Sequence, residues 1–369
     1  MVPTQYTQLL QHKMTQESLT KEAIELLKNL IETPSFSSEE DQTARLLENW
    51  FMEHTIPFKR TKNNVWAVNK HFDKSKPTML LNSHHDTVKP NNGYTKDPFK
   101  AIVEDGKLYG LGSNDAGGCL VSLLATFTHF YDKENLTYNL VIVGSAEEES
   151  SGPDGLNSML SVIPFIDVAI VGEPTLMNLA VAEKGLVVFD AKVKGTPSHA
   201  AHPNNDNAIY NTIDVLKWFQ DYKFDRSSKA LGDVKMTVTQ INAGKQHNAV
   251  PAAVELVIDV RVNDAYSNEE IKDILEKESP CTSIKARSLR LNSSSISTGH
   301  ELVKAGVAMG RETYGSPTLS DQSVLTCQFL KLGPGDSTRS HTANEFIYLA
   351  EIEEGIDIYI KLLERVLYK

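Results

Sequence analysis

The chain has 369 residues, more than a single hydrophobic core usually serves, so we expect two domains. Hydrophobic residues make up 40% of it and charged residues 23%, which is ordinary for a soluble globular protein. The net charge of −11 disfavours nucleic acid or an anionic membrane surface as a partner, because both require a basic face.

Cysteine usage and hydropathy predict a cytoplasmic protein. Cys119, Cys281 and Cys327 are widely spaced and form no C-x-x-C pair, which indicates neither a disulfide framework nor a thiolate zinc site. A reducing cytoplasm is the simplest setting for such a chain. The N-terminus has no apolar core of signal-peptide length, and no run approaches the roughly 18 apolar residues of a membrane span.

The N-terminal half reads as alternating helices and buried strands. Apolar residues at helical spacing predict a helix over 19–31, which the Thr33-Pro34 pair ends. Ser37 and Glu40 have the spacing of a capping box, which predicts the start of a second helix. Apolar runs predict strands over 64–68, 78–84, 138–143 and 167–171, and a buried helix over 119–127.

Polar side chains stand at the ends of three predicted strands. The first strand ends in His84, His85 and Asp86, the next in three glutamates at 147–149, and the third in Glu173. In α/β sheets the ligand crevice lies beyond the carboxyl ends of the strands. Buried imidazoles and carboxylates require a partner, and a metal ion is one. His84 and Asp86 share a face of an extended backbone, so one could bind a metal while the other orients it or faces the substrate.

A glycine-rich segment over 108–118 adds a further carboxylate, Asp115. Its glycine spacing does not fit a dinucleotide-binding fingerprint. Asp115 lies in this loop close to the start of the predicted helix, where the backbone can approach a bound ion closely.

After residue 178 the pattern changes to a β-α-β-β-α-β order that continues to 289. We expect this segment to form an inserted α+β domain, ferredoxin-like in type. Residues 1–177 and 290–369 then form the other, α/β, domain, with 290–297 as the returning linker. The chain closes with a helix over about 298–313, a strand at 329–332, a loop over 333–345 and a helix over about 344–367.

Seven motifs along almost the whole chain resemble the family of dinuclear zinc aminoacylases and exopeptidases, which includes acetylornithine deacetylase, succinyl-diaminopimelate desuccinylase and carboxypeptidase G. They occur in family order as SHHDTV, LYGLGSNDAGG, SAEEESSG, VGEPT, GTPSHAAHP, HNAVPAAVELVIDVR and GPGDSTRSHTANE. The resemblance implies a zinc-peptidase-like catalytic domain, with a mixed sheet flanked by helices, and an inserted dimerisation or lid domain.

The resemblance also implies a role for each polar residue. Five would hold two divalent ions, zinc or else cobalt or manganese: His84, Asp115 as the bridge, Glu149, Glu173 and His341. Asp86 would orient His84, and Glu148 would be the general base. Such a set suits the chemistry of zinc, which takes histidine nitrogen and carboxylate oxygen and leaves room for water.

Alternatives remain open at each position. His85 could replace His84, and Glu147 could replace Glu148 as the base, because the family usually carries aspartate in this triplet. Glu173 could be a helix-cap carboxylate and His341 a buried structural histidine.

For the inserted domain, the resemblance implies that His199 reaches the active site of a partner subunit in a homodimer and contacts the developing oxyanion. The alternative is a histidine in a turn. Asn248 and Arg261 are candidates for binding the substrate carboxylate, with Lys184, Ser337 and Arg339 as weaker ones.

The expected activity is hydrolysis of the amide bond of an N-acyl-L-amino acid, first of all N-acetylornithine, in arginine biosynthesis. N-acetylcitrulline, an N-succinyl amino acid, or a peptide cleaved by an exopeptidase on the same fold are alternative substrates. The chain offers no nucleophile motif of the G-x-S-x-G kind, in keeping with a metal-dependent reaction.

Overall fold

A computed structural model describes residues 15–368 and divides the chain into two compact units. Unit 1 contains residues up to Leu179 together with Thr298–Thr313 and the chain from Cys327 onward. Unit 2 contains Ala180–Ser297 and Tyr314–Thr326. Residues 290–297, expected as a linker, thus belong to unit 2, where β15 (Ser294–Ser295) pairs with β8 (Leu179–Glu183).

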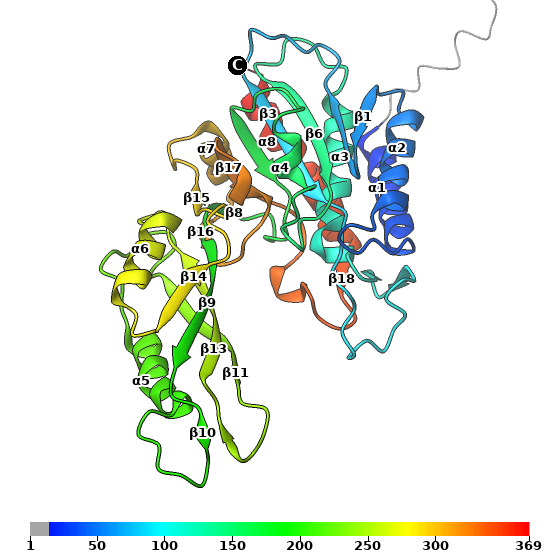
Figure 1. The fold of residues 1–369 in the computed structure, drawn as a ribbon. Coiled ribbons are helices and arrows are strands. Elements are labelled where there is room, and N and C mark those ends of the chain that lie inside the picture. Colours follow the sequence, from blue (N-terminus) through cyan, green and yellow to red (C-terminus); the bar gives the residue numbers. More distant parts are fainter. Residues whose placement is uncertain (1–14, 369) are drawn as a thin grey trace, which may run out of the picture. The chain divides into compact units, whose positions relative to one another are not determined.

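Unit 1 is built on a mixed sheet (Figure 1). The strands that unit 1 contributes to this sheet lie in the order β1, β2, β6, β3, β7, β17. Four of them run parallel, namely β6 (Asn139–Ser145), β3 (Thr78–His84), β7 (Val168–Val171) and β17 (Gln328–Lys331). The other two, β1 (Phe58–Thr61) and β2 (Asn64–Val68), extend the sheet in antiparallel fashion. All residues of β3, β6 and β7 are buried, as their continuous apolar runs require.

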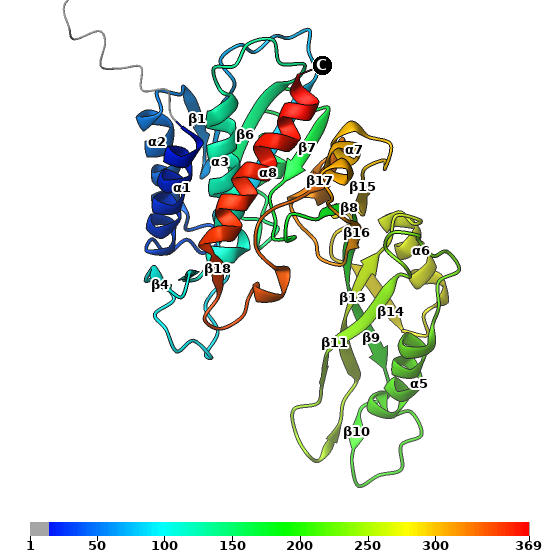
Figure 2. The ribbon, with the colours of Figure 1, turned by 180° about the vertical axis from the view of Figure 1, so that it is seen from behind.

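Three helices of unit 1 pack on one another beside this sheet (Figure 2). They are α1 (Gln16–Ile31), α3 (Gly118–Phe130) and α8 (Leu349–Leu367), and α3 also contacts β3. Helix α3 is buried at almost every position, which explains its nearly uniform apolar sequence. Helices α2 (Asp41–Glu53), α4 (Leu156–Met159) and α7 (Glu301–Ala308) complete the set.

Unit 1 contains a second, three-stranded sheet, and one of its strands takes up residues that we predicted at the start of the closing helix. Its strands lie in the order β18 (Phe346–Tyr348), β5 (Lys107–Tyr109), β4 (Ile102–Glu104). Because residues 346–348 pair with β5, α8 begins at Leu349 rather than near 344. The predicted capping box also does not form: Glu40 itself is the N-cap of α2, and Ser37 instead donates to the Asp86 carboxylate at 2.6 Å.

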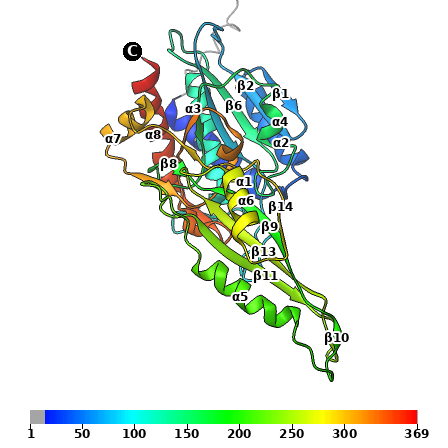
Figure 3. The ribbon, with the colours of Figure 1, turned by 60° about the vertical axis from the view of Figure 1, so that its left-hand side comes forward.

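Unit 2 has the ferredoxin-like order that the sequence predicted (Figure 3). Its four-stranded antiparallel sheet has the order β11 (Lys235–Ala243), β13 (Ala253–Val262), β9 (Gly185–Lys194), β14 (Ser283–Ala286). Helices α5 (Ala208–Asp221) and α6 (Asn268–Glu278) pack against this sheet. A two-stranded ribbon, β10 (Ser198–His199) with β12 (Ala249–Val250), lies beyond one end of it. The remaining strand, β16, is Thr313–Ser316.

None of the helices in the described part of the chain is long and apolar enough to cross a membrane.

Candidate metal centre

The four parallel strands of unit 1 all lead into one group of polar side chains. His84 is the last residue of β3, Glu148 and Glu149 follow β6, Glu173 follows β7, and His341 lies in the loop after β17. Parallel strands have their carboxyl ends on the same edge of a sheet, which explains how residues so far apart in sequence meet.

Asp115 reaches this edge from the glycine loop that leads into α3, and its peptide bond to Ala116 is cis. The loop needs its glycines. Gly112 has a φ of 76°, and a Cβ on Gly117 would lie 2.5 Å from the carbonyl oxygen of Gly112. The small residues therefore let the chain turn tightly just where Asp115 faces the group.

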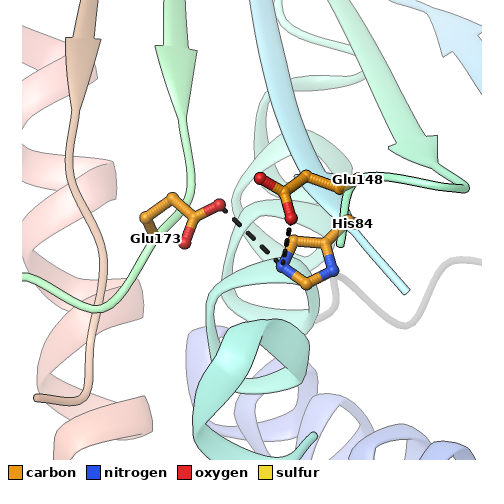
Figure 4. A group of neighbouring side chains, drawn as sticks. All are labelled: His84, Glu148 and Glu173. Atoms are coloured by element: carbon orange, nitrogen blue, oxygen red, sulfur yellow. Dashed lines mark ion pairs between the residues drawn. The ribbon is translucent and has the colours of Figure 1, made fainter. Parts of the chain in front are cut away.

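His84 lies among three carboxylates, and its Nε2 forms no hydrogen bond to any of them. Figure 4 shows two of the three, Glu148 and Glu173. Its Nε2 atom is 3.5 Å from Asp115, 3.8 Å from Glu173 and 3.9 Å from Glu148. The ring is only 1% exposed. Its Nδ1 lies 3.0 Å from the backbone carbonyl oxygen of Asp86, which can only accept, so Nδ1 carries a proton and Nε2 is the nitrogen that faces the carboxylates and that a metal ion could bind.

This arrangement fits a divalent cation. A buried ring nitrogen without a partner carries a desolvation cost, and a metal ion between it and the carboxylates removes that cost. Burial alone would lower the pKa of His84, yet the surrounding carboxylates, Glu148 foremost, raise it well above its usual value, which shows how strongly this position attracts positive charge. Two overlapping groups have ligand atoms within 4.8 Å of one another: His84, Glu148 and Glu173, and His84, Asp115 and Glu149.

A second position for a cation lies on the other side of Asp115. His341 Nε2 is 3.0 Å from Glu149 and 3.6 Å from Asp115 Oδ2, whereas Asp115 Oδ1 faces His84. The hydrogen bond with Glu149 raises the pKa of His341 to about 9. Asp115 thus presents one oxygen to each histidine, which is the geometry required of a carboxylate that bridges two ions.

Asp86 connects His84 to the loop after β6. Its carboxylate accepts the backbone N–H of Glu148 at 3.0 Å and that of Glu149 at 3.1 Å. It also lies 3.4 Å from His84 Nδ1. Burial opposes its ionisation, but these interactions with His84 and Ser37 keep the pKa of Asp86 below its usual value. The carboxylate of Asp86 can therefore fix the ring and this loop together.

Two neighbours that the sequence left as alternatives are turned away from the centre. His85 uses both ring nitrogens, Nδ1 lying 2.8 Å from Thr43 Oγ1 and Nε2 2.9 Å from the carbonyl of Asn63. Burial lowers its pKa to about 4, so the ring is neutral. Glu147 accepts from Ser38 Oγ at 2.8 Å and from the backbone N–H of Asp154 at 3.0 Å. Neither side chain is placed to bind an ion beside His84.

The three expected residues of unit 2 are divided between two ends of its sheet. His199 and Asn248 are exposed neighbours on the β10–β12 ribbon, where the N–H of Ala200 donates to the carbonyl of Asn248. Arg261 lies near the opposite end of β13, in register with Leu186, and pairs with both oxygens of Asp259 at 2.9 and 3.1 Å. Within one subunit, Asn248 and Arg261 do not approach the same group.

One further residue contributes to the centre although no signal in the sequence distinguishes it. Glu345 is 1% exposed and accepts the backbone N–H groups of Asn114 and Asp115. Burial, together with the charge of Asp115, raises the pKa of Glu345 to about 8. Arg339, a candidate for substrate binding, instead forms a two-point ion pair with Glu351. Only the closeness of Glu345 to His341 in sequence could have drawn attention to it.

Fold and centre together define a metal-dependent hydrolase: carboxylates and histidines gather at the carboxyl edge of a parallel sheet, with no serine or cysteine nucleophile among them. The chain belongs to peptidase family M20/M25/M40, whose model matches residues 80–365. It is therefore a metallo-amidohydrolase or peptidase of that family.

Two curated relatives align over nearly their full length. The acetylornithine deacetylase of Proteus mirabilis (strain HI4320) is 28% identical, with 92% of this chain and 96% of that protein covered. The succinyl-diaminopimelate desuccinylase of Rickettsia akari (strain Hartford) is 24% identical, with 93% and 100% covered.

Solved structures confirm the expected fold. An M20 family metallo-carboxypeptidase from Sulfolobus solfataricus superimposes with a TM-score of 0.73 at 17% identity, covering 94% of this chain and 99% of that one. A dinuclear metal-binding peptidase of the M20 family from Bacillus subtilis gives 0.73 at 15% identity, covering 95% and 99%.

Proposed function

We propose that the protein hydrolyses the amide bond of an N-acyl-L-amino acid, with N-acetylornithine as the substrate and ornithine and acetate as the products. The observation that carries the proposal is the buried Nε2 of His84, which has no hydrogen-bond partner and faces three carboxylates. The full-length similarity to an acetylornithine deacetylase supports the choice of substrate. Arginine biosynthesis is then the setting, and the three free cysteines suit a cytoplasmic one.

The proposed centre holds two divalent ions, zinc in the first place and cobalt or manganese as alternatives. His84 and Glu173 would hold one ion, Glu149 and His341 the other, and Asp115 both. When bound, the ions supply a Lewis acid for the amide carbonyl and lower the pKa of a bound water.

In this scheme Glu148 is the general base. Its carboxylate lies 3.9 Å from His84 Nε2, which places it beside the proposed centre, where it can take a proton from the attacking water. It then delivers that proton to the nitrogen of the leaving amine. Asp86 keeps Glu148 in place through the backbone hydrogen bond at 3.0 Å.

We also propose that the protein forms a homodimer through unit 2. The outer face of α5 carries three exposed apolar side chains, Ile209, Tyr210 and Ile213, of which Tyr210 is 69% exposed. Helix α5 packs against β11, which is an edge strand of the sheet among the described residues and carries exposed Ile241. An apolar helix face beside an open strand edge suits pairing with a second copy of the same surface.

The dimer would also explain the separation of Asn248 from Arg261. If His199 reaches the partner subunit's active site to contact the developing oxyanion, Asn248 goes with it, because both lie on the β10–β12 ribbon. Arg261 would then meet the same substrate carboxylate from the other subunit. Substituting Ile213→Asp is expected to yield monomers that retain metal but turn over slowly, as measured by light scattering and assay.

One experiment tests the proposed reaction directly. Zinc-loaded protein is assayed against N-acetylornithine, N-acetylcitrulline, the N-succinyl forms of both amino acids, and a set of dipeptides. We expect the highest kcat/KM for N-acetylornithine and no turnover after chelation. The succinylated substrates are included because desuccinylases are also among the relatives. Cleavage of dipeptides with no turnover of any N-acyl amino acid would overturn the proposal in favour of an exopeptidase.

A further inference from the structure

Glu345 lies directly behind the bridging position without being one of the five ligand residues. A single oxygen of its carboxylate accepts the backbone N–H of Asn114 at 2.8 Å and that of Asp115 at 2.9 Å. Glu345 belongs to the loop after β17 that also carries His341, so this carboxylate ties the backbone of Asp115 to the loop of His341.

Asn114 makes the reciprocal connection. Its side chain is fully buried, and its amide donates through Nδ2 to the carbonyl of Asp336 at 3.1 Å. The same amide accepts the backbone N–H of Asp336 through Oδ1, also at 3.1 Å. Each loop thus contributes one buried side chain that satisfies the backbone of the other. We call these four hydrogen bonds, formed by Glu345 and Asn114, the loop lock.

The two candidate metal positions differ in how they are supported. His84 ends β3 and Glu173 follows β7, and these strands are direct neighbours, with Asn82 in register with Val171. The ligands of the second position come from loops: Glu149 lies beyond the end of β6, and His341 lies in a long loop with a φ of 59°. The sheet therefore fixes the first position, whereas the second depends on contacts between loops.

We propose that Glu345 and Asn114 are positioning residues that assemble the second metal position, by holding the His341 loop against the backbone of Asp115. This rests on the dinuclear centre of the proposed function. The sheet supports the first metal position and the loop lock supports the second. Loss of the loop lock therefore lowers the affinity for the second ion selectively and leaves the first ion bound.

The test measures zinc binding by calorimetry and by elemental analysis, with no reference to turnover. Glu345→Met removes the acceptor but keeps the bulk, and Glu345→Gln is its matched control, because a carboxamide oxygen can still accept both N–H groups. We expect two ions per chain in the unaltered protein and in Glu345→Gln. In Glu345→Met we expect one tightly bound ion and a second ion weakened at least tenfold.

Asn114→Leu gives an independent measurement, and it decides the matter if Glu345→Met does not fold. We expect the same selective loss of the second ion. The inference is overturned if folded Glu345→Met or Asn114→Leu binds both ions as tightly as the unaltered protein, or if its affinities for the two ions fall equally. It is also overturned if Glu345→Gln behaves like Glu345→Met, because the effect would then come from the lost charge and not from the lost hydrogen bonds. A single ion in the unaltered protein would instead refute the dinuclear centre, so the two failures are distinguishable.

Discussion

The carboxylate of Asp86 accepts the backbone N–H of Glu148 at 3.0 Å, so the residue proposed to orient the His84 ring also holds the backbone of the proposed general base. The neighbouring N–H, that of Glu149, donates to the other oxygen of the same carboxylate. One buried charge therefore positions residues of two adjacent strand ends, β3 and β6.

Replacing Asp86 by asparagine should damage both metal binding and turnover. The amide can offer only one acceptor, and its NH2 group would face a backbone N–H that also donates. We expect metal affinity and kcat each to fall by about 10–100-fold, the usual effect of losing a residue that supports a ligand. Calorimetry with zinc and steady-state kinetics measure the two effects.

Ser37→Ala is the matched control for Asp86→Asn. It removes the hydroxyl that donates to Asp86 at 2.6 Å but leaves the backbone contacts intact. Its effect should be clearly smaller. Equal losses in the two variants would contradict the role of the Glu148 and Glu149 backbone contacts.

Glu148→Gln should retain metal and fold while kcat falls by about 10²–10⁴-fold, because glutamine cannot take a proton from water. Glu147→Gln is the control, since its side chain contacts Ser38 and the backbone of Asp154 rather than His84. We expect Glu147→Gln to lower the melting temperature with little change in kcat. Unchanged turnover in Glu148→Gln would remove Glu148 from the mechanism.

His199→Ala should lower kcat by about 10²–10³-fold, the usual cost of losing one donor to an oxyanion, with no change in metal content. His202→Ala is the control, because its ring lies 5.8 Å from that of His199, in the exposed turn that follows β10. Loss of metal in His199→Ala would show that the residue has been assigned the wrong role.

The strand ends were predictable from the sequence because burial and polarity change abruptly there. The apolar runs before His84, Glu147 and Glu173 required strands, and parallel strands bring their ends together. The sequence was less informative about which of two adjacent polar residues takes which role. His85 and Glu147 differ from His84 and Glu148 only in which contacts the fold offers them, and no local pattern encodes those contacts.

Interactions between distant segments account for what the sequence did not reveal. Ser37 has the spacing of a capping box, yet the Asp86 carboxylate, far along the chain, binds its hydroxyl instead. Glu345 is buried because its carboxylate accepts backbone N–H groups of Asn114 and Asp115, more than 200 residues earlier in the chain. Arg339 was a candidate for binding substrate, but in the structure it pairs with Glu351 on α8.

Removal of metal should destabilise the folded protein. The five proposed ligands lie between residues 84 and 341, so the unfolded chain cannot assemble them and binds metal weakly. Zinc at about 100 times its Kd would then stabilise the fold by about 2.7 kcal/mol, and chelation would lower the melting temperature by several degrees. Re-addition of zinc should restore it. His84→Ala is the control, and an equal zinc-dependent rise in that variant would mean that the stabilising ion binds elsewhere.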